Sequence, residues 1–286
     1  MEKPEGLLGL CINGNKLYYA LTNNDSASHL HHIGSMELAG DLPAAIRSGD
    51  TARLDGIGKV IKRLRENFRP AQVRMLTLPD LECWTTFPKL VYDDAAEREA
   101  HLNVLTKGFT RDSVEPYWFE LSAREFRFLT LRNRKVMSVF DRLLGPFPSI
   151  EYCSDFEIGL QWLTHTRHKG SFMTLALYDN CLCAASYMLG KMRAATYIPF
   201  TSIDDLPYFW LQQAGHLKWL RGLHEEVLIY GLNAQKLVNI LRPYLDPSSA
   251  IVRMDNLANM KVDADEKTYG FSLEEAFPAI ILSLGH

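Results

Sequence analysis

Histidines are the residues of this sequence whose spacing first suggests metal chemistry. His29, His31 and His32 lie close together, and His29 and His31 would share one face of a strand because successive side chains alternate between its faces. A metal site also needs a third ligand and groups that orient the ligands, and neither is visible in the neighbouring sequence. We therefore interpret these histidines as exposed polar residues of a strand and expect no metal site.

The cysteines favour free thiols over a disulfide framework or a zinc site. They lie in apolar, strand-like stretches, their number is odd, and no CxxC pair occurs. Buried free thiols are typical of a reducing compartment, so we expect a cytoplasmic protein. The cysteines are Cys11, Cys83, Cys153, Cys181 and Cys183.

The composition excludes several classes of function. The 286 residues carry a net charge of −3, so the chain lacks the basic character that favours nucleic acid or an anionic membrane surface. No apolar run reaches the roughly 20 residues of a membrane span. With 47% hydrophobic residues the chain can form a packed core. Walker A, Rossmann and G-x-S-x-G motifs are absent.

Two stretches of the chain repeat one order of elements: three meandering strands, a helix and a further strand. Apolar periodicity predicts the first set at residues 7–12, 16–22, 29–36, 52–68 and 73–78. It predicts the second set at residues 172–178, 181–189, 192–198, 204–223 and 226–230. Asn13-Gly14 is expected as the turn of the first hairpin. A helix at 234–245, a strand at 250–254 and a last helix from about Ser272 complete the second set.

The repeated order predicts an α/β protein with two lobes. We expect the first lobe at residues 1–168 and the second lobe at 169–286. Residues from about 81 to 150 carry additional strand and helix patterns, which predict a small α+β insertion in the first lobe.

Several short motifs stand at characteristic places in this order. Segment 8–14 (LGLCING) stands where a known family has L-G-x-D-x-G, and segment 73–79 ends a strand with proline. Ile198-Pro199 ends the second meander, and segment 276–284 is expected to form the closing helix. On these motifs the chain resembles the actin-like ATPase superfamily, and within it the family of the type IV pilus assembly protein PilM and the cytoplasmic part of the secretion protein GspL. The resemblance implies duplicated ribonuclease-H-like lobes.

The resemblance also implies a nucleotide cleft between the lobes. In the superfamily, glycine-bearing turns hold the phosphates, and an acidic residue in each lobe positions Mg²⁺. The positions of this chain that match the cleft are Asn13, Gly14, Asp179, Asn180, Gly231 and Asn233.

The chain departs from the superfamily's nucleotide motifs at each turn. Cys11 replaces the first-lobe aspartate, and Mg²⁺ prefers oxygen ligands to a thiol. Phe200 replaces a glycine, and its side chain is expected to crowd a ligand, while Leu232 replaces another glycine. We therefore interpret the cleft as vestigial, that of a pseudo-ATPase, and expect no cofactor, with ATP and Mg²⁺ as the alternative.

Each cleft position also has a purely structural alternative. Asp179 either positions a metal ion or is an ordinary turn residue, and Asn13-Gly14 either binds phosphate or only forms a hairpin turn. Gly231 and Asn233 either shape an adenosine cleft, or Asn233 simply caps the start of a helix.

Consecutive aromatic residues in the insertion suggest a partner site. Tyr117, Trp118 and Phe119 follow one another, so in a strand some of them face away from their own core unless both faces are covered. Exposed aromatic residues are plausible anchors for a bound peptide. We predict these three residues as partner-binding, with a doubly covered strand as the alternative.

The resemblance implies a non-catalytic scaffold of a type IV pilus or type II secretion platform. Such a scaffold would be cytoplasmic, recruited to the inner face of the inner membrane by binding the cytoplasmic tail of a membrane partner. The alternative is a divergent nucleotide-binding ATPase or sugar-kinase-like enzyme of the same fold, which would use Asp179. A freestanding actin-like protein of unrelated role is a third hypothesis, because fold does not determine function. The oligomeric state stays open.

Overall fold

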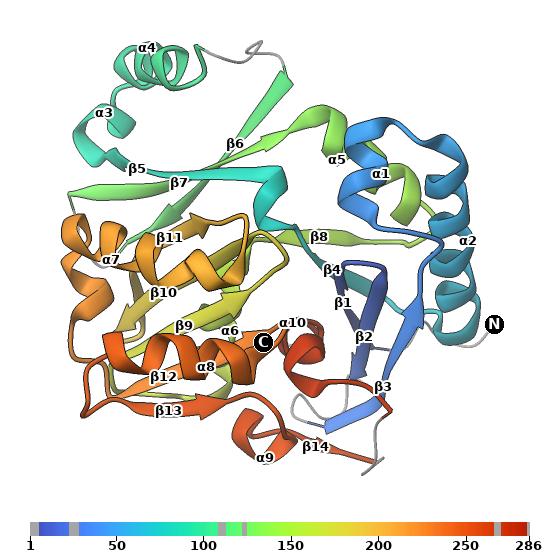
Figure 1. Ribbon diagram of the computed structural model, residues 1–286. Helices are drawn as coiled ribbons and strands as arrows, with labels where there is room; N and C mark the ends of the chain where they lie inside the picture. Colours follow the sequence, from blue (N-terminus) through green and yellow to red (C-terminus); the bar gives the residue numbers. More distant parts are fainter. Residues whose placement is uncertain (1–5, 23–28, 108–112, 122–124, 266–269, 285–286) are drawn as a thin grey trace.

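Three sheets and their surrounding helices make up the computed structural model, which describes residues 6–22, 29–107, 113–121, 125–265 and 270–284 (Figure 1). The first sheet has the strand order β14-β3-β2-β1-β4-β8 and the second β11-β10-β9-β12-β13. Both begin with an antiparallel meander of three strands and continue with two parallel strands. This repeated topology confirms the predicted α/β class with duplicated lobes.

The first sheet follows the predicted meander closely. Its strands are β1 (Leu7–Asn13), β2 (Lys16–Thr22), β3 (His29–Glu37), β4 (Gln72–Leu76), β8 (Ile150–Cys153) and the two-residue β14 (Asp263–Ala264). Helices α1 (Leu42–Ser48), α2 (Thr51–Phe68) and α5 (Arg134–Leu144) belong to this part of the molecule. Helix α1 lies between the strand predicted at 29–36 and the helix predicted at 52–68, where no element was predicted. Leucines and isoleucines of β1 pack with apolar residues of α2 and α5 on one face of the sheet.

The second sheet is formed by β9 (Phe172–Leu177), β10 (Cys181–Met188), β11 (Lys191–Pro199), β12 (Glu226–Gly231) and β13 (Ala250–Arg253). Its outer face is covered by α7 (Leu206–His216) and α8 (Ala234–Leu241). Both helices are shorter than predicted. The backbone leaves the helical region at Leu217, and α8 passes into a 3₁₀ turn that contains Pro243, which has no N–H for a helical hydrogen bond. The short α9 (Leu257–Met260) leads to β14.

The third sheet lies between β4 and β8 in the chain and has the order β5-β7-β6. Its strands are β5 (Glu82–Pro88), β6 (Val114–Glu120) and β7 (Phe126–Asn133), and helices α3 (Lys89–Asp93) and α4 (Ala95–Leu105) connect β5 to β6. A small core packs α3 and α4 on one face of this sheet and includes Phe87, Leu129 and Trp118. We refer to residues 82–133 as the insertion.

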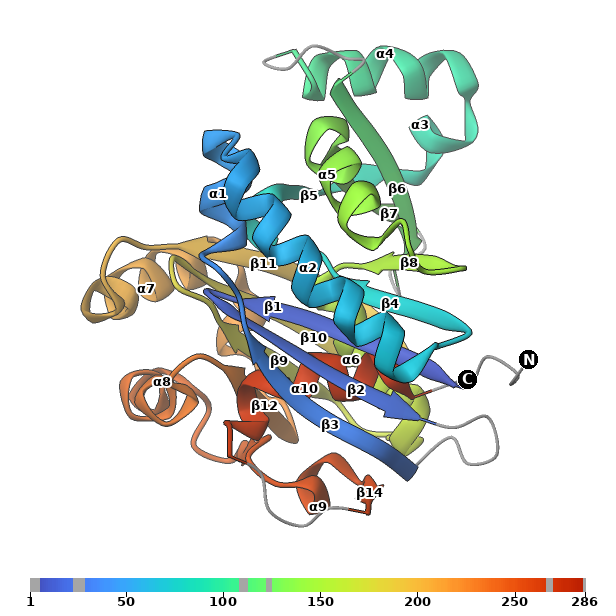
Figure 2. The same ribbon diagram turned by 90° about the vertical axis from the view of Figure 1, so that its right-hand side faces the viewer.

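Two helices cross between the large sheets. Helix α6 (Asp155–Thr166) follows β8 of the first sheet but packs against β9, β10 and β11 of the second. Helix α10 (Leu273–Ser283) comes after the second sheet but packs against β1, β2 and β4 of the first, and the two helices also contact each other (Figure 2). The largest core cluster therefore lies between the sheets and contains residues from both halves of the chain.

Glycines allow these two helices to lie very close to their sheets. A Cβ atom on Gly9 in β1 would lie 1.9 Å from the carbonyl oxygen of Ala279 in α10. A Cβ atom on Gly159 in α6 would lie 2.2 Å from the ring of Tyr187 in β10. A larger residue at either position would push its helix away from the sheet.

None of the helices formed by the described residues combines the length and the apolar character that a membrane crossing requires.

We predict that Gly9→Ala lowers the free energy of unfolding by about 3 kcal/mol, because the added methyl group collides with the main chain of α10. Gly215→Ala is the control, since this helical glycine has open space around it and the change should alter stability by at most about 1 kcal/mol. Urea unfolding of both variants checks the prediction. Equal stabilities would mean that α10 does not approach β1 this closely.

Candidate functional site

A cavity of about 260 Å³ opens where the first hairpins of the two large sheets face each other. Its lining includes Asn13 and Gly14 from the first sheet and Asp179 and Asn180 from the second. Four of the six residues predicted for the nucleotide cleft therefore meet, although they lie in different halves of the chain. The remaining lining residues are Asp41, Pro43, Arg47, Leu78, Pro79, Tyr178 and Cys181.

The first hairpin turn differs in detail from its prediction. Asn13 is the last residue of β1 and pairs with Lys16, so the two loop residues are Gly14 and Asn15. Gly14 adopts a φ of 58°, the left-handed conformation that glycine tolerates best. A Cβ atom at Gly14 would lie 3.7 Å from Oδ2 of Asp179, so the two turns approach each other closely.

The second hairpin turn consists of Asp179 and Asn180, as predicted. The backbone N–H of Tyr178 donates to the carbonyl of Cys181, and the N–H of Phe200 donates to the carbonyl of Asn180. Phe200 belongs to the core of the second lobe and not to the cavity lining, which corrects the expectation that its side chain crowds a ligand.

Gly231 and Asn233 lie outside the cavity lining. Gly231 has a φ of 92°, and a Cβ atom there would lie 2.3 Å from the carbonyl oxygen of Leu177 on the neighbouring strand. This glycine is therefore explained by backbone packing. Asn233 precedes α8 with a φ of 49°, and its side chain makes no capping hydrogen bond to the helix.

A buried carboxyl group lies behind the cavity. Asp155, the first residue of α6, accepts a hydrogen bond from Tyr178 at 2.5 Å and another from Tyr230 at 3.1 Å. Burial raises the pKa of Asp155 from 3.8 to about 7, although both hydrogen bonds act in the opposite direction. Burial likewise raises the pKa of the nearby Cys11 thiol, and the charges of Asp155 and Glu275 raise it further. Both groups are therefore stabilised in their neutral forms.

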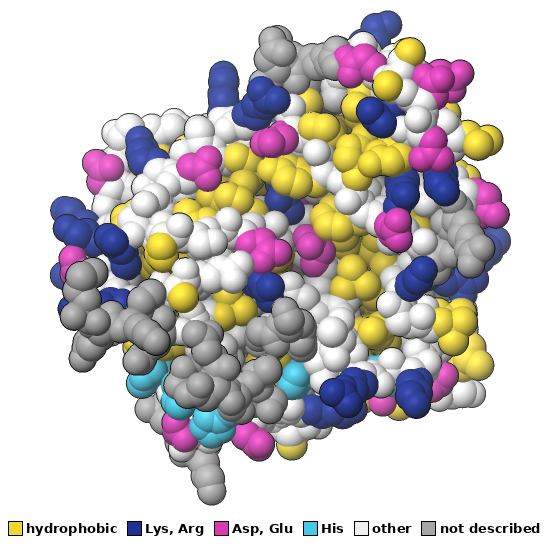
Figure 3. Space-filling view, turned by 180° about the vertical axis from the view of Figure 1, so that it is seen from behind, with side chains coloured by type: hydrophobic (Ala, Val, Ile, Leu, Met, Phe, Trp, Pro, Cys, Tyr) yellow, Lys and Arg dark blue, Asp and Glu magenta, His cyan; other side chains and the backbone are white. Residues whose placement is uncertain are grey.

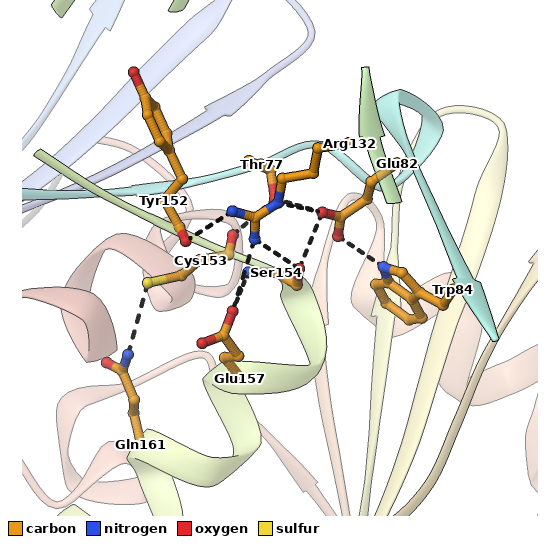
Figure 4. Close-up of polar contacts among 9 residues, drawn as sticks. All are labelled: Thr77, Glu82, Trp84, Arg132, Tyr152, Cys153, Ser154, Glu157 and Gln161. Atoms are coloured by element: carbon orange, nitrogen blue, oxygen red, sulfur yellow. Dashed lines mark hydrogen bonds and ion pairs between the residues drawn. The ribbon is translucent and has the colours of Figure 1, made fainter. Parts of the chain in front are cut away.

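A second polar cluster, missed by the sequence analysis, joins the insertion to the rest of the molecule (Figure 4). Arg132 of β7 and Glu82 of β5 are opposite each other in the strand register, and their side chains are only 2% and 1% exposed. Arg132 Nε donates to Glu82 Oε2 at 3.1 Å, and its Nη2 donates to Ser154 Oγ at 3.0 Å. Thr77 and Trp84 also donate to Glu82.

This buried ion pair links three parts of the fold. Ser154 caps α6 and Thr77 follows β4, so the charges connect the insertion with the first sheet and with the crossing helix. Burial raises the pKa of Glu82, although Arg132 lowers it. Burial also raises the pKa of Glu157, at 3.9 Å from Arg132, to about 7. Only the strand pairing brings Glu82 and Arg132 together, so no local pattern could have revealed them.

Two adjoining cavities form a groove at the start of β6, between α4 and α5. They have volumes of about 290 and 190 Å³, and Val114 and Leu131 line both. The rest of the lining is divided evenly between apolar residues (Leu81, Cys83, Leu102, Pro116 and Val136) and polar or charged ones (Glu82, Glu99, Thr106, Asn133 and Arg134). Glu82 belongs to the buried ion pair described above. Seen from behind, hydrophobic side chains gather below the insertion helices and extend toward the centre of the molecule (Figure 3).

The three predicted partner-binding aromatic residues are half-buried and have contacts within the chain. The Trp118 ring packs on Phe87 and Tyr92, while the Phe119 ring packs on Phe156 at 4.8 Å, on the other face of the sheet. The Tyr117 ring lies 4.3 Å from the guanidinium of Arg132. Both faces of β6 are therefore covered, as in the alternative considered from sequence, and a role of these rings in partner binding stays a prediction.

Among comparisons with known proteins, only solved structures match this chain. No protein-family model and no curated protein matches the chain. A solved PilM–PilN type IV pilus biogenesis complex matches with a TM-score of 0.63 and 13% identity, over 99% of this chain and 97% of the other. A protein from Bacteroides thetaiotaomicron VPI-5482, with an actin-like ATPase fold and unknown function, matches with a TM-score of 0.53 and 11% identity, over 88% of this chain and 94% of the other. The chain has the actin-like ATPase fold.

A third solved structure agrees with this assignment. The cytoplasmic domain of EpsL, an inner-membrane component of the type II secretion system of Vibrio cholerae, matches with a TM-score of 0.52 and 8% identity, over 98% of this chain and 96% of the other. Identities this low show a common fold and leave the activity open.

The residues at the cavity do not fit the magnesium-bound nucleotide that the actin-like ATPase fold implies. Cys11, which the sequence resemblance matches to an aspartate, is a buried thiol with a raised pKa. Asp155 lies behind the lining, where both of its oxygens accept hydrogen bonds from tyrosines. Among the described lining residues the carboxylates are Asp41 and Asp179, and Asp41 already caps α1 through the N–H of Ala44.

We predict that Arg132→Met lowers the free energy of unfolding by about 3–5 kcal/mol, because it leaves the buried Glu82 carboxylate without its counter-ion. Glu82→Gln in the same background should recover part of the loss, since it removes the uncompensated charge. Arg53→Met, at a half-exposed ion pair with Asp50, should cost at most about 1 kcal/mol. An equal cost for the two arginine variants in urea unfolding would contradict a stabilising role for the buried pair.

The raised pKa of Asp155 predicts a pH-dependent difference in stability. The folded state holds this proton more tightly than the unfolded state, so the group's contribution to stability falls as the pH rises from about 4 to about 7 and is constant above that. Asp155→Asn stays neutral, so its stability relative to the native chain should increase between pH 5 and pH 8. The control Asp55→Asn, exposed on α2, should show no such change. Urea unfolding at pH 5 and pH 8 measures this difference in the free energy of unfolding.

Proposed function

We propose that this protein is a non-catalytic scaffold of a type IV pilus or type II secretion platform, which binds the cytoplasmic tail of an inner-membrane protein. The groove between α4 and α5 carries this proposal. The two most informative structural neighbours support it, because one is solved as a PilM–PilN complex and the other is the cytoplasmic domain of an inner-membrane component. The protein would then act in the cytoplasm, at the inner face of the inner membrane.

The lining of the groove favours recognition through side-chain pockets. Val114, Leu131 and Leu102 offer apolar surface, and Glu99 and Arg134 offer charges at the rim. β6 is an edge strand of its sheet, so a peptide could in principle pair with it as an additional strand. Pro116 in β6 has no N–H, and this interrupts main-chain pairing along the edge. We therefore expect an extended tail whose apolar side chains enter the two cavities.

The chemistry of the cavity between the two hairpin turns supports a scaffold without catalysis. Phosphoryl transfer needs metal ions that neutralise the developing charge. The buried Cys11 thiol and the tyrosine-bound Asp155 carboxyl are not available to hold Mg²⁺. We propose that the meeting of the two hairpin turns now serves to fix the two lobes against each other.

A divergent nucleotide-binding enzyme, such as an ATPase or a sugar-kinase-like protein, is the second candidate. One observation favours it: the cavity brings Asn13 and Gly14 together with Asp179 and Asn180, and it also contains Arg47. Such an enzyme would use Asp179 as its metal-positioning carboxylate.

Isothermal titration with synthetic tail peptides tests the scaffold proposal. The peptides cover the cytoplasmic tails of inner-membrane proteins from the pilus and secretion systems of the same organism. We expect one tail to bind saturably and Pro116→Asp and Arg134→Glu to weaken binding at least tenfold, about 1.4 kcal/mol or more. Both residues are exposed at the groove, so folding should be kept. Leu90→Asp, at an 85% exposed residue of α3 outside the groove, should bind as the native chain does.

Titration with Mg·ATP and Mg·ADP distinguishes the second candidate. The scaffold proposal expects no heat up to millimolar nucleotide. Binding tighter than about 100 µM, roughly 5.5 kcal/mol, together with hydrolysis that Asp179→Ala abolishes, would establish the enzyme instead. Failure of every tail peptide to bind, with a folded protein, would overturn the scaffold proposal.

A further inference from the structure

The edge of the first sheet brings three potential metal ligands together. The short strand β14 pairs with β3 in parallel, with Asp263 opposite His29. Directly after β14, Asp265 Oδ1 lies 2.9 Å from Nε2 of His29, and Oδ2 lies 3.5 Å from Nδ1 of His31. The third ligand that was missing near these histidines in the sequence thus comes from a residue 236 positions away from His29. Histidine side chains gather at the lower edge of the molecule in Figure 3.

The donor atoms suit a borderline-soft divalent transition metal. Two imidazole nitrogens and one carboxylate oxygen match ligands that Zn²⁺ and Co²⁺ accept, whereas Mg²⁺ and Ca²⁺ prefer oxygen alone. The three atoms lie within 4.8 Å of one another. Tetrahedral Zn²⁺ with bonds of about 2.1 Å needs ligand atoms roughly 3.3 Å apart, so the side chains must close in by about 1 Å or slightly more.

The exposure of the ligands permits this adjustment. The side chains of His29, His31 and Asp265 are 33%, 39% and 60% exposed, so their rotamers can shift without disturbing the core. His32 is not part of the cluster, because it packs on Phe68 with ring centroids 5.0 Å apart. The alternation along β3 therefore places His29 and His31, but not His32, on the side that faces Asp265.

We propose that His29, His31 and Asp265 bind a divalent transition-metal ion, with Zn²⁺ as the natural occupant, which fastens β14 to β3. The pairing of β14 consists of two residues, and exposed His–Asp contacts alone stabilise little. A metal bound by both strands adds a strong link between the first sheet and the segment that follows the second sheet. The fourth coordination position would face solvent and hold water.

Titration of the tag-free protein with Zn²⁺ and Co²⁺ near neutral pH tests this proposal. A Cys83→Ser background removes the exposed thiol as a competing ligand. We expect one equivalent to bind with a Kd on the order of 10 µM or tighter, and Co²⁺ to show the absorption of a nitrogen–oxygen site. His31→Ala and Asp265→Asn should each weaken binding at least about tenfold. His216→Ala, at an exposed histidine on α7, should leave the affinity unchanged.

Hydrogen exchange gives an independent readout. Zn²⁺ should slow exchange in residues 263–265 of the native chain and leave the Asp265→Asn variant unchanged. Absence of saturable binding, or affinities that neither His31→Ala nor Asp265→Asn alters, would overturn the proposal and leave ion pairs as the only function of these residues. This outcome is separate from the tail-peptide test, since the groove and the metal ligands share no residue.

Discussion

The close contact between each crossing helix and the sheet of the other half is the constraint on which this structure depends. Each large sheet is covered on its outer face by helices of its own half, but its inner face is covered by α6 or α10 from the other half. Gly9 and Gly159 permit this approach, because any side chain at these positions would collide with a carbonyl or a ring. The meeting of the two hairpin turns at the central cavity, and the placement of Asp155 behind it, follow from this exchange.

Charge burial has a different role at each of the two polar clusters. Around Arg132, a full ion pair is removed from water, and Glu82 accepts compensating hydrogen bonds from Ser154, Thr77 and Trp84, which makes the insertion a fixed part of the fold. Around Asp155, no cation among the described residues compensates the carboxyl, so burial favours its neutral form and two tyrosines satisfy its oxygens. A neutral carboxyl whose oxygens are bound by two tyrosines can hold neighbouring segments together, but it is a poor ligand for a hydrated metal ion.

The features that were predictable from the sequence are those with local signals. The strands of both meanders and the Asp179-Asn180 turn follow from alternation and turn residues over a few positions. Three features were not predictable in this way: the loop at Gly14-Asn15, the Glu82–Arg132 pair and the approach of Asp265 to His29. Strand register and packing decide each of them, and the last two join residues 50 and 236 positions apart. The cleft residues were predictable only through the resemblance to a known fold.

The position of α10 at the far end of the described chain also sets the order in which the protein can assemble during synthesis. The inner face of β1, β2 and β4 stays uncovered until residues 273–283 have left the ribosome. The N-terminal half therefore emerges first yet cannot complete its own core, and its apolar face stays open to aggregation during translation. Nascent chains of this protein should therefore engage chaperones until α10 covers this face.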